Sequence, residues 1–173
     1  MNNHIVTQRL QLIPLELEQL KMILKNPEAL EKSLNITIMR DQITDRVLRA
    51  IGMKITKMQK VDVSQRDWVT YWLIVIKDKN AGAGMLGFKG FPNENGSTEI
   101  GYGLDPVYQG KGYMREAVQA LIDWAFTHPF CNVITATEVE NPASKQLLER
   151  LGADLVGASN GATSWEIRKK QQG

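Results

Sequence analysis

The chain has 173 residues, of which 43% are hydrophobic and 23% are charged, and its formal net charge is +2 at pH 7. These values fit one soluble globular domain over residues 1–173, with residues 168–173 as a frayed polar tail. They give no support for nucleic-acid binding, and no apolar run reaches the roughly 18 residues of a membrane-spanning helix.

Two further features of the sequence indicate the cellular compartment. The N-terminal residues lack the basic and apolar regions of a secretory signal. Cys131 is the only cysteine, which rules out an internal disulfide framework and fits a reducing compartment. We therefore expect a cytoplasmic protein without a membrane partner.

The N-terminal third predicts one strand and two amphipathic helices. Residues 7–15 alternate in the manner of a strand, and apolar residues then recur at helical spacing as far as residue 24. Residues 41–60 place their apolar side chains on one stripe of a second helix, despite Gly52. The opposite face of this second helix carries four basic residues, a pattern typical of a solvated face.

From Trp68 onward the pattern changes to strands. Residues 72–77 form a β-branched apolar run, and residues 85–91 can return beside it as the second arm of a hairpin. A third strand is predicted over residues 98–104, after a turn rich in asparagine and glycine.

The C-terminal part predicts two helices that alternate with strands. A long helix begins after Gly112, and a strand over residues 133–139 follows it. A short helix over residues 141–151 is closed by Gly152. Two last strands, joined by an Asn-Gly turn, cover residues 154–158 and 163–168.

These elements predict an α/β (α+β) fold with about seven strands and about four helices. The strand–helix–strand connection over residues 98–139 requires one parallel pair, because a crossover helix returns the second strand in the same direction. We expect a mixed, mostly antiparallel twisted sheet that is flanked by helices.

Two glycine motifs compete as phosphate sites. Residues 82–87 match G-x-G-x-x-G, but the dinucleotide fingerprint requires a helix that opens inside the motif. Gly90 and Pro92 follow too closely for such a helix. We interpret residues 82–87 as a hairpin turn and not as a nucleotide site.

Residues 109–114 have the context that the first motif lacks. A strand ends before them and a long helix begins within them, so the unpaired N–H groups of the first helical turn point at any ligand there. Gly110 and Gly112 allow a close approach of the backbone, and Lys111 adds a positive charge. A plain glycine-containing turn is the alternative interpretation.

Two motifs at this separation resemble those of a known family. Residues 99–113 resemble the acyl-CoA-binding motif of the GNAT superfamily of N-acetyltransferases, whose pattern is Gln/Arg-x-x-Gly-x-Gly/Ala. Gln109 and Gly112 meet this pattern, whereas Met114 replaces the last small residue. Residues 138–153 resemble the second motif of the family, in which Asn-x-x-Ser opens a short helix.

The N-terminus adds to this resemblance. Thr7-Gln8-Arg9-Leu10-Gln11-Leu12 is similar to the opening of the branch that contains ribosomal-protein N-terminal acetyltransferases. The resemblance implies a sheet with a splayed parallel strand pair at the cofactor site.

The resemblance also implies a binding site for acetyl-CoA as cosubstrate. The pyrophosphate is expected on the N–H groups of the loop, and the pantetheine arm is expected beside Leu104 and Asn141. The predicted cofactor-binding residues are Leu104, Gln109, Gly110, Lys111, Gly112, Tyr113, Met114 and Asn141.

Two side chains are the candidate catalytic residues. Glu99 stands where several family members carry a general base, and its strand neighbours Gly101 and Gly103 leave room on the same face. Many relatives carry a tyrosine acid on the last helix, where this chain has none, so Ser144 is the remaining hydroxyl. The alternatives are a solvent-facing Glu99 and a Ser144 that only binds. The main-chain N–H of Leu104 is the expected oxyanion donor.

The predicted function is acetyl transfer from acetyl-CoA to a primary amine, by direct attack through a tetrahedral intermediate. The acceptor is a small molecule or a protein N-terminus, chosen by residues 26–66 and the groove near Gly103. The alternative is a non-catalytic acyl-CoA-binding or regulatory module, which Met114 and the missing tyrosine favour. The oligomeric state stays open, with a homodimer as one option.

The remaining singled-out side chains have structural interpretations. No set of metal ligands accompanies His4 or His128, so we predict no metal. Cys131 is expected in the core, as are Trp68 and Trp72, for which a position in the wall of the acceptor groove is the alternative.

Overall fold

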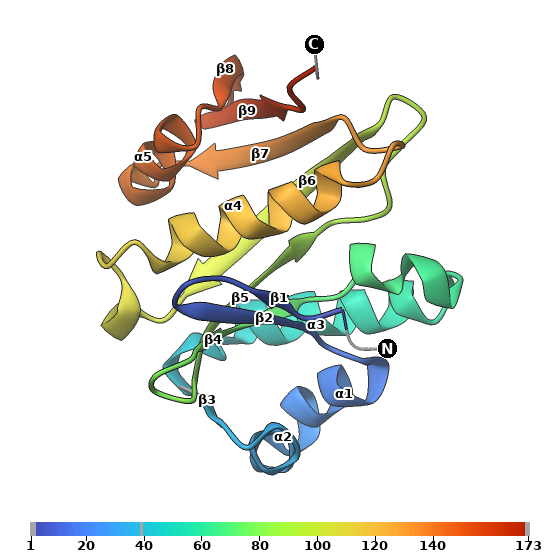
Figure 1. The fold of residues 1–173 in the computed structure, drawn as a ribbon, viewed down its shortest axis with the longest axis vertical. Coiled ribbons are helices and arrows are strands. Elements are labelled where there is room, and N and C mark those ends of the chain that lie inside the picture. The colour runs from blue at the N-terminus through green and yellow to red at the C-terminus, as the bar shows by residue number, and fades with distance from the viewer. Residues whose placement is uncertain (1–2, 39, 172–173) are drawn as a thin grey trace.

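The computed structural model describes residues 3–38 and 40–171, which form one twisted sheet with helices on both faces (Figure 1). The strand order is β1-β2-β4-β5-β6-β7-β9-β8, with β3 paired to β5. Two pairs, β3–β5 and β6–β7, are parallel, and the other pairs are antiparallel. The expected mixed sheet with a parallel pair is therefore confirmed.

Within the described part of the chain the sheet has nine strands, where about seven were expected. The two additional strands have only two residues each, which is too short for a periodic signal. The strands are β1 (Ile5–Val6), β2 (Leu10–Pro14), β3 (Thr37–Ile38), β4 (Trp72–Ile76), β5 (Ala81–Phe88), β6 (Ser97–Leu104), β7 (Val133–Val139), β8 (Asp154–Ser159) and β9 (Ala162–Arg168). Because β9 includes Arg168, the predicted tail began one residue too early.

Five α-helices lie between these strands in the described residues, one more than expected. They are α1 (Leu17–Lys25), α2 (Pro27–Leu34), α3 (Asp45–Met58), α4 (Tyr113–Phe126) and α5 (Pro142–Arg150). The unpredicted helix α2 has a clear start signal, because Pro27 occupies its first turn and the Asn26 side chain accepts a hydrogen bond from the Ala29 N–H. Short 3₁₀ turns cover Arg40–Gln42, Val63–Trp68 and Pro106–Tyr108.

The glycines of residues 82–87 lie in strand β5, so the predicted hairpin turn was wrong at this place. A Cβ on Gly84 would clash with the Gly103 carbonyl oxygen and lie 2.9 Å from Leu104 Cα. A Cβ on Gly87 would lie 2.5 Å from the Thr70 carbonyl oxygen. These glycines therefore allow neighbouring backbones to approach closely, which explains a glycine motif that opens no helix.

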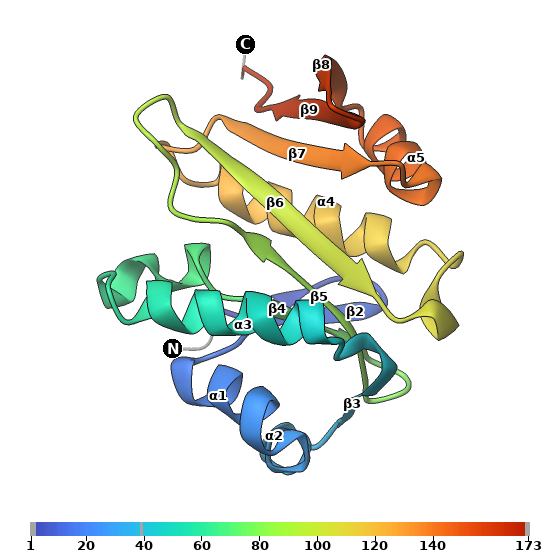
Figure 2. The same ribbon diagram turned by 180° about the vertical axis from the view of Figure 1, so that it is seen from behind.

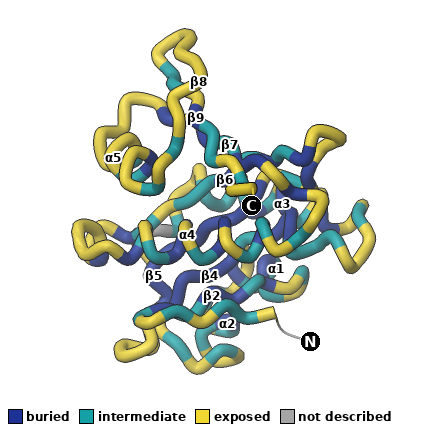
Figure 3. The backbone as a smooth tube through the Cα atoms, turned by 45° about the horizontal axis from the view of Figure 1, so that its top comes forward, coloured by how far each residue is buried: buried dark blue, intermediate teal, exposed yellow. Residues whose placement is uncertain are grey.

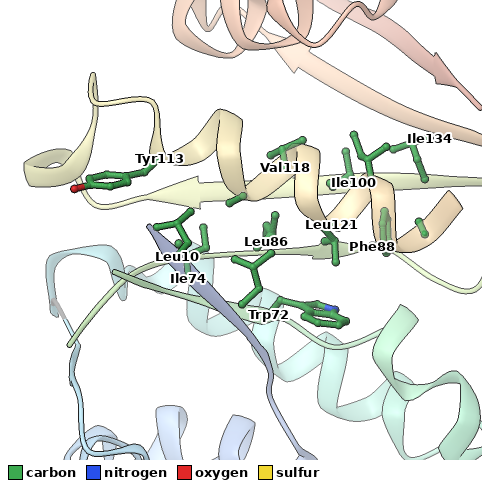
Figure 4. Close-up of a cluster of buried hydrophobic side chains, with 14 of the residues drawn as sticks. Leu10, Trp72, Ile74, Leu86, Phe88, Ile100, Tyr113, Val118, Leu121 and Ile134 are labelled. Atoms are coloured by element: carbon green, nitrogen blue, oxygen red, sulfur yellow. The ribbon is translucent and has the colours of Figure 1, made fainter. Parts of the chain in front are cut away.

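The sheet separates two hydrophobic clusters (Figures 1 and 2). On one face, α4 packs its apolar stripe against the central strands, and Figure 4 shows Val118 and Leu121 among side chains of β4, β5 and β6. On the other face, α1, α2 and α3 cover β2, β4 and β5. Trp68, Trp72 and Cys131 are fully buried in the first cluster, which confirms their expected structural role.

The parallel pair β6–β7 separates soon after it starts. Its ladder joins residues 97–99 to residues 133–135, although β6 continues to Leu104 and β7 to Val139. Beyond the ladder, β6 follows β5 and β7 follows β9. The two halves of the sheet diverge there, and Figure 3 shows α5, β8 and β9 projecting from the buried centre. No helix in the described part of the chain is both long and apolar enough to cross a membrane.

Candidate active site

A groove of about 410 Å³ opens where β6 parts from β7, on the side of the sheet that α4 and α5 cover. Its walls come from the end of β6, the loop before α4 and the first turns of α5. Eight of the ten predicted site residues line it: Leu104, Gln109, Gly110, Gly112, Tyr113, Met114, Asn141 and Ser144. The other two, Glu99 and Lys111, do not line this groove.

The loop at one end of the groove is shaped by two left-handed glycines. Gly110 has φ +76° and Gly112 has φ +80°, values that side chains with a Cβ rarely adopt. Gly112 is the N-cap of α4 and provides no capping side chain, so the N–H groups of the first turn face the groove without an intrahelical partner. The Gln109 side chain donates to the Leu104 carbonyl oxygen at 2.9 Å and ties the loop to β6.

The edge of β6 that faces the gap directs main-chain groups into the groove. Residues 99 and 105 direct their main-chain groups to the other side, away from β7. The Glu99 carbonyl oxygen accepts a hydrogen bond from Lys89 N, and the Asp105 N–H donates one to the Ala83 carbonyl oxygen of β5, each at 2.8 Å. Because backbone groups alternate in direction along a strand, Tyr102 and Leu104 direct theirs toward β7. The ladder to β7 has already ended at this level, so these groups can pair with an extended ligand.

Two hydroxyl groups meet at the other end of the groove. Tyr102 Oη lies 2.6 Å from Ser144 Oγ, and both residues line the groove. Burial raises the pKa of the Tyr102 phenol above its usual value, so this hydroxyl stays protonated at neutral pH. Whichever hydroxyl donates to the other, the pair keeps one O–H proton for a third group.

Asn141 holds Ser144 in this place. As N-cap of α5, its side-chain oxygen accepts a hydrogen bond from Ser144 N at 3.1 Å. Asn141 N in turn donates to the Glu138 carboxylate, which also accepts from Thr163 Oγ1 at 2.7 Å. Hydrogen bonds from Asn141 N and Thr163, in that order, hold the pKa of Glu138 below its usual value despite burial. Glu138 thus anchors the start of α5.

Glu99 lies at the point where the two strands separate. It is paired with Thr135 in the last rung of the ladder, accepts from Thr137 Oγ1 at 3.0 Å and forms an ion pair with Lys89. Its side chain is 26% exposed and belongs to the face that α4 does not cover, together with Gly101 and Gly103. A Cβ on either glycine would meet no atom within 4 Å, so this face is open beside Glu99.

Comparison with known proteins identifies the family. Residues 9–154 match the family described as Acetyltransferase (GNAT) domain. The chain belongs to the GNAT acetyltransferase family.

Among curated proteins, it is 44% identical over 95 residues to the uncharacterized N-acetyltransferase YjdG of Bacillus subtilis, a match that covers 54% of this chain and 56% of YjdG. It is 29% identical over 140 residues to the ribosomal-protein-serine acetyltransferase of Escherichia coli, which covers 79% of this chain and 72% of that protein. The match to the ribosomal-protein-serine acetyltransferase agrees with the expected branch of the family.

Solved structures of the family share this fold. One of them is RimL, described as a ribosomal L7/L12 alpha-N-protein acetyltransferase, in complex with coenzyme A. The TM-score is 0.66 at 23% identity, and the superposition covers 96% of this GNAT protein and 98% of RimL. The likeness extends over nearly all of both chains.

Among the groove residues of this GNAT protein that the sequence analysis missed are Tyr102, Arg115 and Arg150. Tyr102 shares one face of β6 with Ile100 and Leu104, so its pattern is that of an ordinary core residue. Arg115 and Arg150 add two exposed guanidinium groups to the groove, and Arg115 Nη2 donates to the Arg150 carbonyl oxygen at 3.4 Å. The position of Arg115 in the first turn after the glycine loop was the one available signal.

The histidines of this GNAT protein lie outside the groove lining. His4 Nδ1 is hydrogen-bonded to the Gln11 side chain at 2.7 Å, and the His128 ring packs edge-on against Trp124 at 4.7 Å. Within residues 3–38 and 40–171, no three histidine, cysteine or acidic side chains are grouped closely enough to hold a metal ion.

Proposed function

We propose that this GNAT protein transfers the acetyl group of acetyl-CoA to the α-amine of a protein or peptide. One observation carries this proposal. The groove at the split between β6 and β7 has an anion-binding loop at one end and a pair of hydroxyl groups at the other. Coenzyme A has a matching order of groups, with a charged pyrophosphate and an extended arm that ends in a thiol.

The loop and two arginines fit the charged part of the cofactor. N–H groups at the start of α4 suit the pyrophosphate, because the helix dipole favours an anion there. Arg115 and Arg150 are placed for further phosphate oxygens. The pantetheine arm, which carries amides, would pair with the main-chain groups that Tyr102 directs into the gap, since the Leu104 carbonyl oxygen already accepts from Gln109. Met114 is half-buried and packs against the core below the loop, which is compatible with a ligand above it.

The acceptor amine would approach from the opposite face of the sheet. The cofactor occupies the α4 and α5 side, and the open space beside Gly101 and Gly103 leads to the same gap from the other side. An α-amine with a pKa near ~8 is more easily deprotonated than a lysine amine with a pKa near ~10.4. Glu99 is the proposed base, directly or through water, and the incoming ammonium group competes with Lys89 for this carboxylate.

Hydrogen-bond donors in the groove would stabilise the negative charge that develops on oxygen and on sulfur during the reaction. The Leu104 N–H is the proposed donor to the oxyanion of the tetrahedral intermediate, because it points into the gap. When the carbon–sulfur bond breaks, the electron pair passes to sulfur, and the Ser144 hydroxyl donates a hydrogen bond to the thiolate. The Tyr102 hydroxyl holds Ser144 in place through the hydrogen bond between Tyr102 Oη and Ser144 Oγ, which are 2.6 Å apart. A thiolate with a pKa near ~8.5 departs with this modest assistance.

The acceptor class is proposed from the relatives. RimL is described as acting on the α-amine of a ribosomal protein, and the Escherichia coli relative is described as a ribosomal-protein-serine acetyltransferase. A protein N-terminus is therefore the first acceptor to test for this chain. A free small-molecule amine is the second.

Free-thiol release from acetyl-CoA tests the proposal. The wild-type chain is mixed with acetyl-CoA and a peptide that has a free N-terminus, and the control peptide is blocked at its N-terminus but keeps an internal lysine. We expect thiol release only with the free N-terminus. If calorimetry detects coenzyme A binding while no peptide or small amine raises thiol release above hydrolysis, the chain is instead a non-catalytic binding module.

A further inference from the structure

A network of polar contacts joins the N-terminus to the phosphate loop. Arg9 Nη1 donates to the Lys111 carbonyl oxygen at 2.9 Å, and Arg9 Nε donates to Glu116 Oε2 at 2.7 Å. Glu116 Oε1 accepts from Arg9 N at 2.9 Å and from Thr7 Oγ1 at 2.6 Å. The Arg9 guanidinium also lies 4.4 Å from the centre of the Tyr113 ring.

We propose that Arg9, held by Glu116 and Thr7, is a positioning residue that fixes the phosphate loop in its cofactor-binding conformation. The inference rests on the proposed function, since it assigns the loop to coenzyme A. It also explains the opening Thr-x-Arg-Leu motif, whose residues do not line the groove and have no other role in the site.

The geometry of the peptide bond gives the mechanism. In a trans peptide the C=O and N–H groups point in opposite directions, and the structure has no cis peptide bond among the described residues. Arg9, which does not line the groove, binds the Lys111 carbonyl. The N–H of the same peptide unit, which belongs to Gly112, therefore points away from Arg9, and we infer that it points to the groove side of the loop. Without Arg9, this glycine-flanked peptide unit can rotate and lose that direction.

The clamp is built on rigid elements. Arg9 immediately precedes β2, whose first residue Leu10 is fully buried, and Glu116 lies in the first turn of α4. Gly112 leaves room for the guanidinium, because a Cβ there would lie 3.3 Å from Arg9 Nη2. The carboxylate of Glu116 compensates the charge of Arg9, so the clamp adds little net attraction for an anion.

The ionisation of Glu116 agrees with this arrangement. Burial raises the pKa of this carboxyl, but hydrogen bonds from Thr7 and Arg9 outweigh burial and hold the pKa below its usual value. Glu116 is therefore an anion at neutral pH, and its contact to Arg9 Nε is a charge-assisted hydrogen bond, with the backbone N–H of Arg9 on the second carboxylate oxygen.

Glu116→Gln separates positioning from simple electrostatics. The substitution removes a negative charge near the loop, so electrostatics alone predicts tighter binding of coenzyme A. Loss of the clamp predicts weaker binding, by about tenfold. Arg9→Lys keeps the positive charge but loses the several N–H donors of the guanidinium group, and we expect a similar loss of affinity for coenzyme A. Thr7→Val, which changes no charge, should weaken binding less.

Calorimetric titration of the full chain with coenzyme A measures these affinities. Asp123→Asn is the matched control, because it removes an exposed carboxylate from the same helix at a distance from the loop. Thermal unfolding reports whether each variant is folded. In the acetyl-transfer assay, KM for acetyl-CoA should rise with the dissociation constant, while kcat at saturation stays within about twofold.

Equal or tighter binding by Glu116→Gln, together with unchanged binding by Arg9→Lys and Thr7→Val, would overturn the clamp. So would variants that lose kcat but keep their affinity for coenzyme A. A wild-type chain that binds coenzyme A without releasing thiol would contradict only the proposed function. A wild-type chain that does not bind coenzyme A would refute both.

Discussion

Tyr102→Phe removes the one oxygen through which β6 supports Ser144. The variant keeps the aromatic ring that lines the groove and loses the hydroxyl that lies 2.6 Å from Ser144 Oγ. If Tyr102 acts through Ser144, the effect must depend on Ser144 being present. The perturbation is therefore a pair of single variants, Tyr102→Phe and Ser144→Ala, and their combination.

The expected magnitude follows from the hydrogen bond. A hydrogen bond between two half-buried neutral groups contributes about 0.5–1.5 kcal/mol net, and about 1.4 kcal/mol corresponds to tenfold in rate. Tyr102→Phe should therefore lower kcat up to about tenfold if this contact is expressed in the transition state. Ser144→Ala removes the group that faces sulfur and should cost more, about thirtyfold. The double variant should be no slower than Ser144→Ala.

Steady-state thiol release at saturating peptide and varied acetyl-CoA provides the measurement. KM for acetyl-CoA should change by less than about twofold in all three variants, because the loop at the other end of the groove is intact. Tyr71→Phe is the matched control, since this half-buried tyrosine lies on the opposite face of the sheet. Losses that multiply in the double variant would refute a role of Tyr102 through Ser144, and a change in KM alone would indicate binding only.

Three further predictions concern the base, the strand contact and a buried lysine. Glu99→Gln should lower kcat at pH 7 by about 10–100-fold and leave the affinity for coenzyme A unchanged. The difference in kcat from the wild type should narrow above pH ~8, because the α-amine is then deprotonated without a base. A loss of affinity for coenzyme A would exclude the base role. Gly84→Ala should destabilise the fold by about 1–3 kcal/mol and weaken coenzyme A binding, because the added Cβ displaces Gly103 at the groove. Urea unfolding measures the stability and calorimetry measures the binding, and wild-type values for both would contradict this prediction. Lys54 is buried among carbonyl groups, and burial, then Lys57 and Lys89, lowers its pKa to about 7. Between pH 7 and 10.5 the unfolded chain binds more protons at this side chain, so its contribution should raise stability by about 2–3 kcal/mol from pH 6 to pH 9. Urea unfolding should show that Lys54→Met removes this rise; an equal rise in the variant would show that another group causes it.

Local patterns predicted the parts of the site that lie within one continuous segment. The glycine loop and the start of α4 are adjacent in sequence, so turn chemistry and helix periodicity were sufficient to find them. Asn141 and Ser144 also lie in one continuous segment, at the start of α5, and they were chosen because that segment resembles the second motif of the family. The parallel pair followed from the crossover between β6 and β7.

Contacts between distant segments could not be predicted in this way. Tyr102 and Ser144 are 42 residues apart, and Arg9 and Glu116 are 107 residues apart. Periodicity assigns a side chain to a face and does not say which partner it meets there. Gly84 is a second example, because the need for a glycine there comes from the neighbouring backbone of β6 and not from the sequence around Gly84. A local motif search therefore mistook strand glycines for a turn.

Mass spectrometry of the peptide product tests the central claim most directly. The wild-type chain is incubated with acetyl-CoA and a serine-initiated peptide that also carries an internal lysine, and the product is fragmented to locate the acetyl group. The groove, the hydroxyl pair and the open face beside Glu99 predict one acetyl group on the α-amine, formed only in the presence of the protein. An acetyl group on the lysine alone would contradict the proposed acceptor. No acetylated peptide or small amine, despite bound acetyl-CoA, would contradict acetyl transfer itself.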